Sequence, residues 1–365
     1  GAHTAVHTSL ALSAILGTIL TVCGIAVSRA LLTAMNTPAE VLEDAVLYIR
    51  LYFGGVLFSV VYNMAAGILN AAGNSKRSLL YLGVASVTNI VLDLVLIAGC
   101  RMGVAGAAIA TDISQLVSCV LSLRFLMRVE DDYRVTAKEV RVHKKMAVRI
   151  IKVGLPTGIQ NMVISLSNVL VQVSVNGYGA AAMAGFAAYM KVDGFNILPV
   201  LSFSMAATTF VGQNFGAGKA DRVRRSYLLT LGYAALAAAV FGGLFLLFGR
   251  QFLSLFTPEA DVIDAGLQRI AVMCFSFPLS ALMDNTTAAS RGLGKGLVPM
   301  ILVFLGSCVF RVIWIYTVFA YFHTIGSLYL LYPFSWLITG TAEIAYFVYC
   351  YRKYVRLLEA SPAGK

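Results

Sequence analysis

Charged side chains are scarce in this sequence. Asp, Glu, Lys and Arg make up 12% of its 365 residues, whereas a soluble globular domain has about 25%. Apolar residues make up 59%, and the mean hydropathy is +0.81. A soluble fold would have to bury more than half of the chain in one core. The composition therefore excludes a soluble protein and predicts one that is embedded in a lipid bilayer.

The sequence also lacks the spacings that metal and redox sites need. The four histidines (His3, His7, His143 and His323) are scattered at predicted loops and helix ends, and the six cysteines form no CxxC pair. Gly212–Lys219 resembles a phosphate-binding loop, but Ala220 replaces the required Ser or Thr, and no strand precedes it. We therefore expect no metal site built from these residues, no cofactor and no enzymatic activity.

Long apolar runs occupy most of the chain. A run of about 20 apolar residues is long enough to cross a bilayer as a helix. Ten such runs predict an all-α membrane protein with ten transmembrane helices, at about 8–32, 44–69, 79–99, 103–127, 148–175, 184–213, 226–249, 262–290, 297–320 and 326–350.

Basic residues alternate between the connections of these spans. If the connection after residue 127 is cytoplasmic, its side of the membrane holds most of them: Lys76, Arg77, Arg128, Arg134, Lys138, Arg141, Lys144, Lys145, Arg149, Lys219, Arg222, Arg224, Arg225, Arg291, Lys295, Arg352, Lys353, Arg356 and Lys365. Lys and Arg are enriched in cytoplasmic loops. We therefore expect a multi-pass protein of a bacterial plasma membrane with both chain ends in the cytoplasm. The net charge of +11 belongs to these loops, so no nucleic-acid partner is expected.

Two parts of the chain resemble each other. Thr37-Pro38-Ala39-Glu40 corresponds to Thr257-Pro258-Glu259-Ala260, Gly73-Asn74-Ser75 to Gly294-Lys295-Gly296, and the segment from Gly1 to the segment from Gly218. Six predicted spans separate equivalent positions, so both copies cross the membrane in the same direction. We predict an N-terminal bundle over 1–128, a cytoplasmic linker over 129–147 and a C-terminal bundle over 148–365.

The repeat also predicts helices that this sequence does not contain. Residues 148–217 hold two spans of the second copy, yet Gly1 already aligns with Gly218. We therefore expect a complete protein of twelve helices, six in each half, whose first two helices are missing here. A natural protein of ten helices is the alternative.

Four short motifs resemble the multidrug and toxic compound extrusion (MATE) family. They are Val211-Gly212-Gln213-Asn214-Phe215-Gly216-Ala217-Gly218, Ser290-Arg291-Gly292-Leu293-Gly294, Gly154-Leu155-Pro156 and Asn89-Ile90-Val91-Leu92-Asp93. Their order and helix spacing match the family over essentially the whole chain. The resemblance implies two six-helix bundles and export of cationic or amphipathic drugs in exchange for H+ or Na+.

Asp93 is the acid that we single out within a span. It lies about seven residues, roughly 10 Å, from the predicted external end of its helix. Asn89 is one turn away on the same face, and Thr111 lies at matching depth on the next span. The resemblance implies that Asn63, Asn89, Asp93 and Thr111 form the polar cluster of the N-terminal half, although the family's first-helix Asp is absent. We expect Asp93 to bind the coupling proton. The alternatives are Na+ held there by these oxygens and a purely structural hydrogen-bond network.

The second copy is chemically different, because Trp314 occupies the position equivalent to Asp93. The residues that we expect to line a substrate cavity are polar or charged: Gln160, Ser165, Asn168, Gln172, Lys191, Asp193, Asp284 and Arg311. Interhelical hydrogen bonds and a neutralised Asp193–Arg311 pair are the structural alternatives. Ile164 stands where the sodium-linked branch of the family has an acid, which favours proton coupling.

We therefore interpret the chain as a monomeric multidrug antiporter that exports small molecules by alternating access. One alternative is a lipid-linked oligosaccharide flippase of the same superfamily, whose cavity should be strongly basic. A membrane prenyltransferase is a weaker alternative, because it needs two Asp-rich Mg2+ motifs and Asp93 is a single carboxylate.

Overall fold

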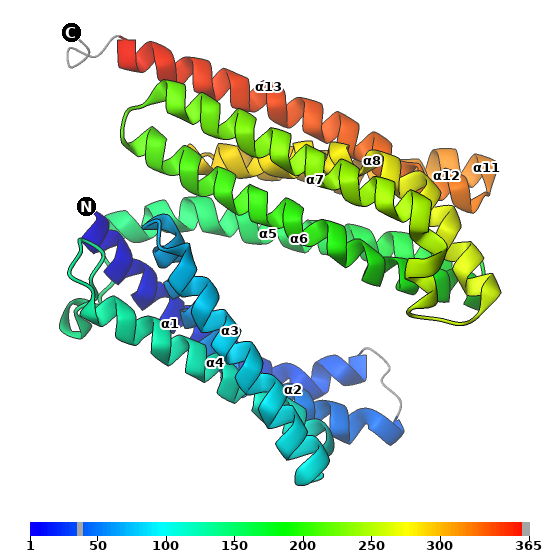
Figure 1. Cartoon of the computed structure of the whole chain (residues 1–365), viewed down its shortest axis with the longest axis horizontal. Helices are drawn as coiled ribbons and strands as arrows, with labels where there is room; N and C mark the ends of the chain where they lie inside the picture. The colour runs from blue at the N-terminus through cyan, green and yellow to red at the C-terminus, as the bar shows by residue number, and fades with distance from the viewer. Residues whose placement is uncertain (35–38, 360–365) are drawn as a thin grey trace. The chain divides into compact units, whose positions relative to one another are not determined.

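The computed structural model describes residues 1–34 and 39–359, and within them it contains only helices and the turns that join them (Figure 1). A helix satisfies each backbone N–H and C=O inside its own segment, as a lipid-embedded chain requires. Nine helical segments of this described part are long and apolar enough to cross a membrane. The predicted all-α membrane fold is confirmed.

The first of two compact units covers Gly1–Ile150. It holds α1 (Ala2–Ala34), α2 (Ala39–Ala71), α3 (Ser75–Asp93) and α4 (Gly103–Arg128), and α3 continues as a π-helical segment, η1 (Leu94–Gly99). α1 packs along α2, and α4 packs along both α2 and α3. The four spans predicted before residue 129 all lie on these helices. Thr37 and Pro38 of the sequence repeat lie outside the described residues.

The connection between α4 and α5 is attached to α1. It contains one 3-10 turn, η2 (Ala137–Glu139). The buried His7 accepts a hydrogen bond from the Thr136 amide at 3.0 Å and donates one through Nδ1 to the His3 carbonyl at 2.8 Å. His3 pairs with Glu139 at 3.0 Å. The view that all four histidines are scattered was therefore wrong for His3 and His7, which lie together with Glu139. Both His7 nitrogens are already engaged, so this group fastens the linker.

The second unit covers Ile151–Lys365. Its long helices are α5 (Lys144–Asn176), which starts in the first unit, α6 (Ala180–Gly216), α7 (Ala220–Ser254) and α8 (Ala260–Gly292). α6, α7 and α8 pack against one another, and α13 packs along α8. A Cβ on Gly185 of α6 would lie 2.8 Å from the Gly266 amide nitrogen of α8. Small residues thus allow the close helix contact that lipid-embedded helices favour.

The last two predicted spans are interrupted helices. The ninth, predicted over 297–320, consists of α9 (Leu297–Val303), η3 (Phe304–Val309), α10 (Phe310–Trp314), η4 (Ile315–Phe319) and α11 (Ala320–Phe322), in which η3 and η4 are π-helical. The tenth consists of α12 (Ile325–Tyr329) and α13 (Leu331–Glu359). Widened turns leave carbonyls free for other donors, and the hydroxyl groups of Ser335 and Ser167 donate to the carbonyls of Gly306 and Ser307 at 2.9 and 2.6 Å.

Local structure repeats at the positions where the sequence repeats. After α2, Gly73 takes a φ of 83°, and the Asn74 amide bonds to the Leu69 carbonyl at 2.8 Å. After α8, Gly294 takes a φ of 74°, and the Lys295 amide bonds to the Ser290 carbonyl at 3.0 Å. Both are glycine-terminated helix ends of the same type.

The ion pairs and the π-helical segments repeat as well. Arg29 pairs with Glu43 at 2.6 Å, and its counterpart Arg250 pairs with Asp264 at 2.5 Å. η1 follows Asp93, and η4 follows the equivalent Trp314. Two of the few basic residues on the predicted external side are thus neutralised by the helix that follows.

Candidate functional site

Asp93 lies at the point where α3 changes from an α-helix to the π-helical η1. Its side chain is partly buried, and its Oδ1 atom is buried without a hydrogen-bond partner among the described residues. An unsatisfied buried oxygen costs about 1–3 kcal/mol, and π-helical insertions frequently occur at functional sites. Asp93 is therefore an unsatisfied intramembrane carboxylate on an irregular helix.

The other predicted members of this cluster are not hydrogen-bonded to Asp93. The Thr111 hydroxyl donates to the Ala107 carbonyl of its own helix at 3.0 Å, and Asn63 is exposed and donates to the Ser59 carbonyl at 2.9 Å. Asn89 lies one turn before Asp93, partly buried. α3 and α4 pack side by side, so Asn89, Asp93 and Thr111 lie on neighbouring helices. No side-chain hydrogen bond links these residues in the described part of the chain.

Asp112 is a second intramembrane acid, which sequence reasoning missed. It lies on α4 and packs against Gly55 of α2, where a Cβ on the glycine would clash with the carboxylate. In the described residues it has no ion-pair partner. An acid inside the predicted span 103–127 was the signal that should have identified it.

A cavity of about 550 Å³ lies within the second unit. Its walls come from α5, α6, α8, the interrupted ninth span and α13. Three arginines (Arg269, Arg291 and Arg311) and two acids (Asp193 and Asp284) line it among apolar and amide side chains. The size fits a small-molecule ligand, whose pockets are typically about 300–1,000 Å³.

Six of the eight residues predicted to line a cavity do so, namely Gln160, Asn168, Gln172, Asp193, Asp284 and Arg311. Ser165 and Lys191 do not. Both are exposed, and the Lys191 ammonium lies over the Phe256 ring at 5.5 Å. Lys191 and Asp193 are two residues apart on α6, so their side chains diverge.

Arg269 of α8 is the most enclosed charge of this cavity. Its side chain is 2% exposed, and its guanidinium carbon lies 3.6 Å from the Phe186 ring centre and 4.5 Å from that of Tyr189. Tyr329 and Tyr332 complete the cage, both at 5.2 Å. In the part of the chain that the structure describes, its Nε and Nη1 atoms have no hydrogen-bond partner. The aromatic faces stabilise the cation but leave N–H donors unused.

Arg311 does not pair with Asp193, contrary to the alternative raised from the sequence. Its Nη1 atom donates to the Ser167 hydroxyl and to the Asn168 amide oxygen, both at 3.2 Å. The guanidinium carbon also lies 4.5 Å from the Tyr332 ring centre. Asp193 lies instead within electrostatic range of Arg269, and its buried Oδ1 atom is unpartnered. The neighbours of Arg311 and Asp193 are therefore determined by the order of the helices around the cavity, and not by the depth of these residues in the membrane.

A second group of charges lies toward the Gly292 end of α8. Arg291 donates to the Gln160 amide oxygen of α5 at 2.9 Å and lies within electrostatic range of Asp284 and of Glu343 on α13. Glu343 is fully buried, and neither carboxylate oxygen has a hydrogen-bond partner within residues 1–34 and 39–359. Arg269, Arg291 and Glu343 were not identified as site residues. Arg269 and Glu343 lie in predicted spans, where a charge is the expected signal, whereas Arg291 was assigned to a cytoplasmic connection.

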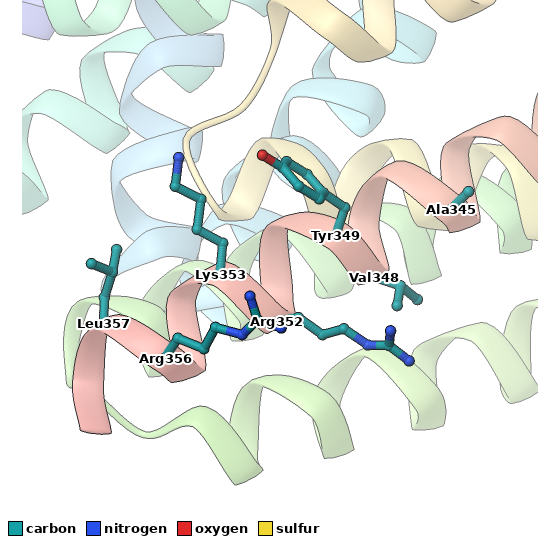
Figure 2. A pocket seen from close by; sticks show the side chains of 7 residues that line it. All are labelled: Ala345, Val348, Tyr349, Arg352, Lys353, Arg356 and Leu357. Atoms are coloured by element: carbon teal, nitrogen blue, oxygen red, sulfur yellow. The ribbon is translucent and has the colours of Figure 1, made fainter. Parts of the chain in front are cut away.

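An open basic surface lies at the end of α13. Arg352, Lys353 and Arg356 project from its last turns beside Tyr349 and Leu357 (Figure 2). All seven residues that line this hollow come from the one helix. Such clusters at helix ends favour the negatively charged cytoplasmic leaflet.

Comparison with known proteins assigns both units to one family. The family model described as MatE matches residues 1–95 and 156–317. The probable multidrug resistance protein YpnP of Bacillus subtilis is 29% identical over 289 residues, which cover 79% of this chain and 64% of that protein. The probable multidrug resistance protein NorM of Thermotoga maritima is 27% identical over 279 residues, which cover 74% of this chain and 59% of that protein. The chain thus spans less than two thirds of the length of these relatives.

Solved structures share the fold. A crystal structure of MATE in complex with MaL6 has a TM-score of 0.87 at 23% identity and covers 99% of this chain and 85% of that one. The outward-facing conformation of a multidrug resistance MATE family transporter of the MOP superfamily has a TM-score of 0.87 at 24% identity and covers 98% and 80%. At these identities the likeness shows the fold alone.

Proposed function

This chain belongs to the MatE family of transporters, and on that premise we propose that it is a multidrug efflux antiporter. Its substrates are cationic or amphipathic small molecules, and export proceeds by alternating access. Its family membership also confirms the prediction that it is a transporter and not an enzyme.

One observation carries this proposal. The family model matches helices of both units, from residue 1 to 95 and from 156 to 317. The relatives that match over most of this chain are called multidrug resistance proteins. Charged residues inside membrane spans mark substrate and ion pathways, and the unit Ile151–Lys365 places five of them around one cavity.

We assign coupling to the first unit. Asp93 is the carboxylate that we propose to bind H+ or Na+, with Asn89 and Thr111 on the adjoining helix faces and Asn63 the more distant member. The unpartnered Oδ1 atom of Asp93 supports this role, because an ion or proton would satisfy it. Asp112 is a further carboxylate of the same unit.

The remaining proposals follow from the charge pattern. We propose a monomer in a bacterial plasma membrane, with the linker 129–147 and both chain ends in the cytoplasm. The three cations at the end of α13 support this orientation.

A resistance test of the full-length protein in an efflux-deficient host examines the function. The expected result is an increased tolerance of several unrelated amphipathic drugs that disappears when the ion gradient is collapsed. A host that gains no tolerance and extrudes no dye would contradict the proposal. Varying the H+ and Na+ gradients separately identifies the coupling ion.

The charged residues that line the cavity distinguish drug efflux from the flippase alternative. A pyrophosphate-binding cavity should be strongly basic, whereas this cavity combines three guanidinium groups with two carboxylates. The mixture favours drug efflux, although it contains more cations than the sequence indicated.

A further inference from the structure

Two buried guanidinium groups face the same cavity, and together they have only one carboxylate within electrostatic range in the described part of the chain. Arg269 and Arg311 are 2% and 3% exposed, and both line the cavity of the second unit. Neither forms an ion pair with any residue of the described chain. A buried charge is costly unless it is paired and hydrogen-bonded, and the two cations share a single nearby carboxylate, Asp193.

The two groups lie within electrostatic range of each other. Their guanidinium carbons lie 5.2 and 4.5 Å from the centre of the same Tyr332 ring. Their separation therefore cannot exceed the sum of these two distances. A carboxylate or phosphate is wide enough to accept hydrogen bonds from donors on both sides.

Three donors at this place are buried and unsatisfied. Nε and Nη1 of Arg269 and Nε of Arg311 have no hydrogen-bond partner within the described residues. Asp193 is the acid in range of Arg269, but it does not pair with it, and this leaves the cluster with one excess positive charge. Apolar side chains, among them Phe277, Met273 and Trp336, line the same cavity and offer a surface for a hydrophobic body.

We propose that this cavity binds the anionic group of an amphipathic substrate between Arg269 and Arg311, with the apolar part of the molecule against Trp336. The shared chemistry is a carboxylate or a phosphate attached to a hydrophobic body. This inference rests on the proposed export function and specifies that its amphipathic substrates include those with an anionic or zwitterionic head group.

The test uses fluorescent probes that differ only in their head group. The purified full-length chain in nanodiscs is titrated with dansyl-labelled undecanoic acid, its neutral amide and the corresponding amine. Binding is followed by energy transfer from tryptophan, of which the chain has two, one lining the cavity. The expected result is that the acid binds about tenfold more tightly than the amide, equivalent to about 1.4 kcal/mol.

Variants then show which residues cause the preference for the acid. Arg311→Gln and Arg269→Gln should each abolish the preference for the acid while retaining amide binding, and Arg311→Lys should retain part of it. Arg224→Gln is the matched control, because it removes the same charge from an exposed position at the start of α7. If Arg311→Gln does not fold, the test rests on Arg269→Gln, which by itself must abolish the preference for the acid.

Equal binding of the acid, amide and amine by the wild type would overturn the inference, as would a preference that survives in both variants. Competition by inorganic phosphate separates a site for free anions from one that requires the hydrophobic body. Ethidium efflux in cells keeps the two proposals apart. Efflux without an acid preference contradicts this inference alone, whereas an acid preference without efflux of any probe contradicts the export function.

Discussion

The buried oxygen of Asp93 leads to a direct test of coupling. Asp93→Asn keeps the size of the side chain and most of its hydrogen bonding but removes the ionisable group. We expect the variant to fold and bind drug, yet to lose export against a gradient, because a neutral amide can neither carry a proton nor balance the charge of a bound cation. The measurement is drug-driven proton movement in proteoliposomes. Coupled exchange at the wild-type rate would show that the site is assigned wrongly.

At Asp112, in the same unit, the effect of packing on stability can be measured separately from the effect of the charge. Its carboxylate lies against Gly55, so Gly55→Ala should lower stability by about 1–3 kcal/mol through overpacking. Asp112→Asn preserves the shape and should leave the melting temperature in detergent nearly unchanged. Gly67→Ala on the same helix is the matched control, since a Cβ there meets open space. Equal melting of both alanine variants would contradict this contact.

The π-helical segment η3 depends on a close approach to α13. A Cβ on Gly306 would clash with the Thr339 hydroxyl, whereas one on Gly243 of α7 meets no neighbour. We expect Gly306→Ala to cost about 1–3 kcal/mol, and Gly243→Ala to be neutral or stabilising by up to about 1 kcal/mol, since glycine is unfavourable inside a helix. Thermal unfolding in detergent compares the two. Stability that is unaffected by Gly306→Ala would mean that η3 can move away from α13.

The orientation proposed for the full chain is tested by cysteine labelling. In a background without the six native cysteines, single cysteines replace Lys138 of the linker and Asp261 at the start of α8. An impermeant maleimide should label position 261 in intact cells and position 138 only after permeabilisation, because basic connections remain in the cytoplasm. The reverse pattern would invert the predicted topology.

Much of the fold could be predicted from composition and pattern. Lipid leaves the backbone no partner outside its own segment, so each long apolar run must be helical, and every predicted span lies on helix. The repeat that aligns Gly73 with Gly294 also aligns two helix ends with the same hydrogen bonds. Asp93 was identifiable without coordinates, because an acid inside an apolar run is costly and therefore conspicuous.

The directions of the side chains were not predictable in this way. A helix that is apolar on all sides carries no periodic signal for its inner face, so the packing of neighbouring helices alone places Asp193 in the cavity and Lys191 outside it. The same packing gives Arg311 the partners Ser167 and Asn168, and surrounds Arg269 with four aromatic rings. These contacts join residues that are far apart in the chain. The sequence does indicate how deep a residue lies in the membrane, but residues at one depth can lie on different faces of the same helix.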